Sequence, residues 1–225
     1  MSTGVGDIWG YDSVVLKRYA EFITFTQGFD PESATQYVDF NRFDRLYGML
    51  RCRFAFVPMK ERLEIIKHED IMPRLNLIGG YRVLKDRDNI LERMAHDSFD
   101  PRNEVILETQ PGVEPVPGDE RGMVRMVDSS TDHLTVEADL RVPSILLISD
   151  AYADGWQAHP MVGSVQDEYQ LMPANYILRA IPLAEGKHKL RIEYAPRSFE
   201  VGKRTSVIAL TLYVGLLIWS LDRKS

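Results

Sequence analysis

Cysteine is almost absent from this sequence of 225 residues, which contains only Cys52. A single cysteine excludes an internal disulfide framework and any metal site built on a pair of cysteines. It does not indicate the redox compartment, because many exported bacterial proteins also lack disulfides. The expected role of Cys52 is that of a small, buried apolar residue.

Motifs for catalysis, metal binding and phosphate binding are also missing. No G-x-S-x-G elbow, phosphate loop, G-x-G-x-x-G or H-E-x-x-H occurs. The five histidines stand far apart, and none lies four residues from another: His68, His96, His133, His159 and His188. We therefore predict no catalytic residue, no metal site and no cofactor in this chain.

Positive charge is not concentrated anywhere. The sequence has 27 Lys and Arg against 33 Asp and Glu, a net charge of -6, and its basic residues are scattered. This distribution excludes nucleic acid as a partner, because nucleic-acid binding needs a basic patch or stripe. The first residues provide neither a basic region nor an apolar segment of the kind that directs export.

The first half of the chain mixes helix and strand patterns. Amphipathic spacing predicts helices over Asp12–Phe25 and around Arg42–Leu50, and Asp86 is placed to cap a helix that ends at Met94. Residues 53–58, 75–84 and 104–108 are typical of strands, with Gly79–Gly80 marking a bulge or a close approach of two backbones. Residues 1–108 are thus predicted to form a small α/β unit.

The pattern changes after residue 108. Residues 109–121 contain three prolines and two glycines without periodicity, which indicates a linker between domains. Residues 122–200 then read as short strands separated by turns, and His133–Leu140 alternates apolar and polar residues. We predict an α+β protein in which the α/β unit is followed by a mostly antiparallel β-sandwich.

A long uncharged run closes the sequence. Thr205–Leu221 reads TSVIALTLYVGLLIWSL, and charged residues precede and follow it. This length is at the short end of what crosses a hydrocarbon core, so we predict one C-terminal transmembrane helix over residues 205–221. A buried hydrophobic helix is the alternative. Basic residues at both ends leave the orientation open.

One segment suggests a binding site. Ser149–His159 reads SDAYADGWQAH, so that a hydrophobic strand runs into a turn with Tyr152 and Trp156. Aromatic faces stack on sugar rings, and Asn175 and Arg179 in a nearby strand could hydrogen-bond to sugar hydroxyls. These four residues form our predicted substrate-binding site. The alternative is that Trp156 closes the end of the sandwich core.

Several separated segments together resemble a known family. They are GYDSVVLKRYAEF from Gly10, MPRLNLIGGYRVL from Met72, SFDPRNEVILE from Ser98, ILLISDAYADGW from Ile145 and PANYILRAIPLAEGKHKLRIEYAPRSFEVG from Pro173. In order and spacing they resemble the C-terminal extracytoplasmic region of the bacterial membrane protein YfhO family, which is of the GT-C glycosyltransferase type. The sequence after Trp156 departs from that family, because it is longer and lacks the expected Asp-Gly hairpin.

This resemblance implies an accessory domain at the cell membrane, with most of the chain extracytoplasmic. Its partners would be the membrane, a glycan or polyprenyl-linked sugar, and a polytopic membrane part that is missing or separate. The family moves sugars onto cell-envelope glycans or lipids, and its catalytic acid lies in a part that this chain does not contain. Alternatives are a non-enzymatic membrane-anchored protein and a self-contained carbohydrate-binding β-sandwich.

Overall fold

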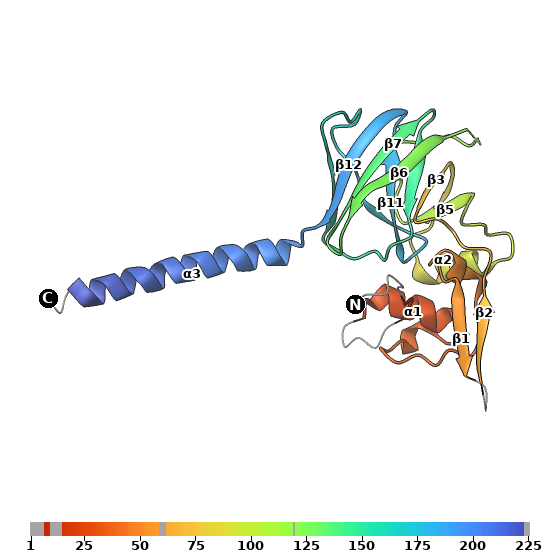
Figure 1. The fold of residues 1–225 in the computed structure, drawn as a ribbon, viewed down its shortest axis with the longest axis horizontal. Helices are drawn as coiled ribbons and strands as arrows, with labels where there is room; N and C mark the ends of the chain where they lie inside the picture. The colour runs from red at the N-terminus through yellow and green to blue at the C-terminus, as the bar shows by residue number, and fades with distance from the viewer. Residues whose placement is uncertain (1–6, 10–14, 59–61, 119, 223–225) are drawn as a thin grey trace.

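The structure is a computed structural model that describes residues 7–9, 15–58, 62–118 and 120–222. It has the predicted α+β composition, with sheets that are mostly antiparallel. Three layers make up the body of the molecule: helices, a six-stranded sheet and a four-stranded sheet (Figure 1). A hairpin and a long helix project from this body.

The six-stranded sheet is the middle layer, and its strand order is β3-β8-β11-β10-β5-β4. Its pairs are antiparallel except β4 and β5, which are parallel and joined through helix α2. A helical crossover of this kind is what a parallel pair requires. The strands are β3 (Leu75–Ile78), β4 (Gly80–Val83), β5 (Glu104–Leu107), β8 (Ser144–Ile148), β10 (Met172–Ala174) and β11 (Leu178–Leu183).

The four-stranded sheet packs on one face of the middle layer and forms the sandwich. Its order is β6-β7-β12-β9, and its strands are β6 (Gly122–Ser129), β7 (His133–Leu140), β9 (Trp156–Pro160) and β12 (Gly186–Tyr194). Alternation along β7 directs Leu134, Val136 and Ala138 into the core, as the sequence predicts. They meet Leu146 of β8 and Ile181 of β11.

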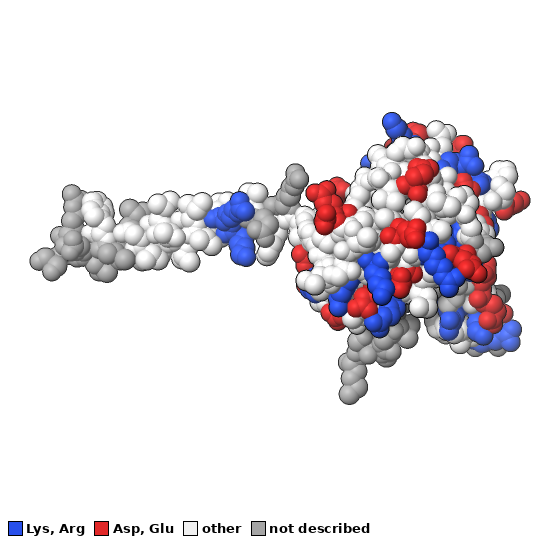
Figure 2. Space-filling model, turned by 90° about the horizontal axis from the view of Figure 1, so that it is seen from above, with Lys and Arg blue, Asp and Glu red and all other residues white. Residues whose placement is uncertain are grey.

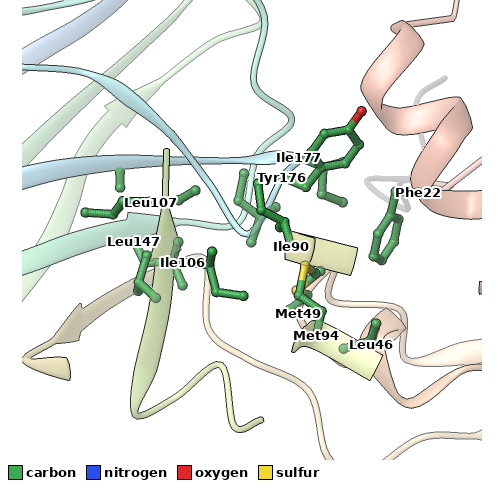
Figure 3. Close-up of a cluster of buried hydrophobic side chains, with 14 of the residues drawn as sticks. Phe22, Leu46, Met49, Ile90, Met94, Ile106, Leu107, Leu147, Tyr176 and Ile177 are labelled. Carbon is green, nitrogen blue, oxygen red and sulfur yellow. The ribbon is translucent and has the colours of Figure 1, made fainter. Parts of the chain in front are cut away.

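Helices cover the other face of the middle layer. The elements are α1 (Lys17–Thr26), α2 (Arg87–Ala95) and the short 3₁₀ helices η1 (Pro31–Ser33) and η2 (Arg45–Gly48). Figure 3 shows Phe22 of α1 and Met94 of α2 converging on Leu147 and Leu107 of the sheet. Asp86 caps α2 as predicted, because its side chain accepts hydrogen bonds from the N–H groups of two residues in the first turn.

Two helix predictions need correction. The Arg42–Leu50 segment forms only the four-residue η2, after which the chain turns sharply and Arg51 adopts a φ of 62°. Helix α1 begins at Lys17, and the predicted cap at Asp12 lies outside the described residues. The glycine prediction is confirmed: a Cβ on Gly80 would lie 2.5 Å from the carbonyl oxygen of Asn103, so the backbones are in close approach.

Residues 109–121 do not separate two independent units. Strands β3, β4 and β5 precede this segment and β8, β10 and β11 follow it, yet all six pair in one sheet. Its described residues form no helix or strand, but Pro111 and Pro115 are buried and the Val116 N–H donates to Pro143 O at 2.9 Å. The predicted division into 1–108 and 122–200 therefore fails, because long-range strand pairing joins the two stretches.

Two elements extend beyond the layers (Figure 1). Strands β1 (Phe54–Pro58) and β2 (Leu63–Lys67) form an antiparallel hairpin, and α3 (Arg197–Asp222) is a straight helix at the C-terminus. Within the described residues, no helix has both the length and the apolar character that crossing a membrane demands. The transmembrane helix predicted over 205–221 is therefore not found, and the side chains at 216–218 and 220–222 lie outside the described set.

Candidate functional site at the end of the sandwich

The predicted site residues come from two strands and two connections. Trp156 begins β9, and Tyr152 lies in the loop that joins β8 to β9. Arg179 is the second residue of β11, where it pairs with Ile148 and lies on the same face as Ile181, toward the four-stranded sheet. Asn175 lies in the turn between β10 and β11.

Arg179 and Trp156 contact each other directly. The guanidinium carbon of Arg179 lies 3.6 Å from the centroid of the indole ring, which is cation–π geometry. The Nε group donates to the carbonyl oxygen of Ala151 at 2.8 Å, and the residue is only 6% exposed. Tyr194 packs beside the same indole, with ring centroids 5.4 Å apart. The structure therefore places a buried cation over an aromatic ring at the sandwich end.

The charge on Arg179 is only partly compensated. Burial lowers the pKa of Arg179 to about 10, with Asp150 opposing the change and Arg74 adding to it. The guanidinium remains charged at neutral pH. Among the described residues, its two Nη groups have no hydrogen-bond partner, and neither is fully enclosed. A bound hydroxyl or anionic oxygen could accept hydrogen bonds from these two groups.

A carboxylate next to this pair is already engaged. Asp150 accepts from Arg74 through both Nε (3.0 Å) and Nη2 (2.7 Å), the fork geometry of a strong charge-assisted pair. Arg51 adds a longer contact of 3.8 Å to the same carboxylate. Two guanidinium groups, of Arg74 and Arg51, thus contact one carboxylate, so Asp150 is not free to pair with Arg179.

Tyr152 belongs to a neighbouring group. Its N–H donates to Ile177 O at 2.7 Å, and its hydroxyl lies 3.2 Å from Asp154. Burial, followed by the charge of Asp154, raises the pKa of Tyr152. Arg18 lies over the ring at 5.6 Å and is paired with Glu108. A hollow of about 510 Å³ beside Arg18 is lined by charged residues of both signs and by Tyr176.

Asn175 is buried inside the fold and does not lie on the surface. The residue is fully buried. Its side-chain oxygen accepts a hydrogen bond from the backbone N–H of Ile106, and its backbone N–H donates to the carbonyl oxygen of Ile106, both at 2.8 Å. Its Nδ2 has no hydrogen-bond partner in the described part of the chain. Asn175 and Tyr176 both have positive φ, 45° and 65°, a conformation that costs energy for side-chain-bearing residues. Asn175 thus fixes the turn that presents Arg179.

The arrangement combines an aromatic ring with several guanidinium groups at the end of the sandwich. No three His, Cys, Asp or Glu side chains in the described residues lie close enough together to hold a metal ion. Sequence reasoning missed Arg74, whose position depends on the pairing of β3 with β8. Only knowledge of that pairing would have placed it beside Asp150.

Comparison of this chain with protein-family models, with curated proteins and with solved structures found no match in any of the three. The site therefore has to be interpreted from its own geometry.

Proposed function

We propose that this chain is a non-catalytic accessory domain that binds glycan for a YfhO-like membrane glycosyltransferase acting on the cell envelope. In this proposal sugar transfer takes place in a polytopic membrane part that is not in this chain. The domain holds the glycan acceptor or the polyprenyl-linked sugar close to that part. The sequence resemblance supports the link to a YfhO-like glycosyltransferase, and the sandwich-end site supports a glycan as the ligand.

The observation that carries the proposal is the Arg179–Trp156 stack. Carbohydrate recognition combines an aromatic ring with directional hydrogen-bond donors, because sugars present apolar ring faces and many hydroxyls. The stack supplies both, at the first residue of β9 and the second residue of β11. The donors on Arg179 are held in place by the bond from its Nε to Ala151 O. A preorganised donor loses little conformational entropy when a ligand binds.

The proposed location is the cell membrane, with the bulk of the chain on the extracytoplasmic side. Helix α3 supports attachment to an apolar environment, because many of its large apolar side chains are exposed, among them Val207, Ile208, Leu210, Leu212, Val214 and Trp219. Exposed apolar surface on this scale marks an interaction site in folded proteins. Attachment through α3 would leave the sandwich-end site on the water-facing body.

Arg179→Lys tests the proposed function. Lysine keeps the positive charge and most of the buried stem but loses the planar fork that stacks and donates. We expect calorimetric titration with soluble oligosaccharides from bacterial envelopes to show binding by the unaltered chain and about tenfold weaker binding by Arg179→Lys, about 1.4 kcal/mol. Arg125→Lys, at an exposed position on β6, is the control. No binding by the unaltered chain, or equal binding by Arg179→Lys, would refute the proposal.

A further inference from the structure

The β1–β2 hairpin exposes large apolar side chains along its whole length. Phe54 is 45% exposed, Phe56 61%, Leu63 58% and Ile65 58%. The register places Phe56 opposite Ile65 and Phe54 opposite Lys67, so these residues share one face of the hairpin. Figure 1 shows strands β1 and β2 extending away from the layers.

The opposite face of the hairpin is mostly apolar. Ala55, Val57 and Ile66 lie there beside the exposed Glu64, and Ile66 is 41% exposed. A hairpin that docks flat on a protein needs only one apolar face, because the other remains in water. Apolar residues on both faces suit a medium that surrounds the element. A lipid interface is such a medium.

Helix α3 provides a second observation of the same kind. It also projects from the body, and it has no charged residue between Arg204 and Asp222. The body, in contrast, shows Lys and Arg interspersed with Asp and Glu over the surface seen in Figure 2. Helix α3 and the hairpin are thus two projecting elements, far apart in the chain, that expose large apolar side chains.

We propose that the β1–β2 hairpin is a membrane-contacting element that inserts its apolar side chains into the interfacial region of a lipid bilayer. Its strand edges carry unpaired backbone N–H and C=O groups, which are not tolerated in the hydrocarbon core. Insertion is therefore limited to the headgroup and upper acyl region. Arg62 is exposed on the hairpin and can meet anionic headgroups there, whereas Lys67 is paired with Glu69 at 2.6 Å.

The test uses the full chain with Cys52→Ser, which removes the only cysteine. Phe56→Cys or Val162→Cys is then added, and each is labelled with an environment-sensitive fluorophore. Val162 is 99% exposed and lies beyond β9, on the body. The probe is vesicles of phosphatidylcholine and phosphatidylglycerol containing a nitroxide-labelled lipid. Circular dichroism checks that each variant keeps its fold.

We expect vesicles to shift the emission of the label at position 56 to the blue and the nitroxide to quench it, while the label at 162 remains unchanged. Phe56→Ser should weaken vesicle affinity about tenfold, because a single buried aromatic contributes on that order, and Val162→Ser should have no effect. Equal quenching at both positions, or none at 56, would overturn the proposal. So would self-association through the hairpin, seen as a dimer in sedimentation that Phe56→Ser abolishes without changing vesicle binding.

Discussion

The two faces of the six-stranded sheet differ in what covers them and in what they hold. On the helix-covered face, Ile145 and Leu147 of β8 continue an apolar core of large side chains (Figure 3). On the sandwich face, Leu146 and Ile148 contact the four-stranded sheet, but the layer ends at a charged residue, Arg179. Alternating residues of a single strand thus contribute to two cores, and the sandwich core has the buried Arg179 at its end.

This difference explains where chemistry can be located. A buried charge is costly unless it is paired, so a guanidinium at the rim of a core indicates a compensating ligand or partner. Arg179 has an indole and one carbonyl as partners, with Asp150 already committed to Arg74. The helix-covered face has charged residues too, but they form ion pairs with each other, as Arg18 does with Glu108.

The largest effect should come from separating the two stretches of chain. A fragment of residues 122–225 lacks β3, β4 and β5, which are three strands of the middle sheet. We expect it not to fold, because one face of β8 would be uncovered and its apolar residues exposed. Amide dispersion in a two-dimensional NMR spectrum, compared with the full chain, measures this. A well-dispersed fragment spectrum would restore the division at 109–121.

A smaller effect should come from one substitution in each core. Leu146→Ala removes a fully buried side chain from the sandwich core, and Leu147→Ala removes one from the helix-side core. Each should lower the free energy of unfolding by about 2–5 kcal/mol. Urea unfolding followed by circular dichroism should show a single transition in both variants, because the two cores share one sheet. Two separated transitions in either variant would show that the faces fold independently.

Much of the secondary structure could be predicted from the sequence. The alternation in His133–Leu140 predicts β7, and the capping position of Asp86 predicts α2. Strands β9 and β10 were missed, because they are short and contain Pro160 and Pro173, which are depleted in strands. The prediction of an independent N-terminal unit failed because β3 and β4 read as one local strand, whereas they lie at opposite edges of the sheet.

The site could be predicted only in part. Trp156 and Arg179 are close, as their neighbouring segments suggested, but a role in substrate binding stays a prediction. Asn175 is buried, because its side chain bonds to Ile106 of β5, a partner 69 residues away that no local pattern shows. Arg74 reaches Asp150 across 76 residues for the same reason. Contacts set by long-range pairing are not encoded in local spacing.

The smallest effects on stability should be those of pH. They have opposite signs at two histidines. Burial lowers the pKa of His188, so the unfolded chain binds its proton more readily and stability is lost as pH falls below about 6.5. Hydrogen bonds to Asp128 and Asp132 raise the pKa of His133, so its stabilising contribution is complete below about 6.5 and is lost as pH rises through the raised value.

Urea unfolding at several pH values separates the two contributions. His188→Gln should reduce the loss of stability on acidification, and His133→Gln should reduce the loss as the pH rises from about 6.5 through the raised pKa of His133. The slope of the unfolding free energy against pH is the readout, since the absolute stability of each variant will also change. Unchanged slopes in both variants would contradict these assignments.

The central claim, that the sandwich end binds glycan, is tested most directly by Trp156→Ala with melting temperature and glycan affinity measured on the same protein. Trp156 is only partly buried, so truncation should cost less than the about 3–5 kcal/mol of a fully buried tryptophan. We predict that the variant melts as one cooperative unit close to the unaltered chain and binds envelope oligosaccharides at least tenfold more weakly, a loss of about 1.4 kcal/mol. A large drop in melting temperature together with unchanged glycan affinity would contradict the account and assign Trp156 to the core.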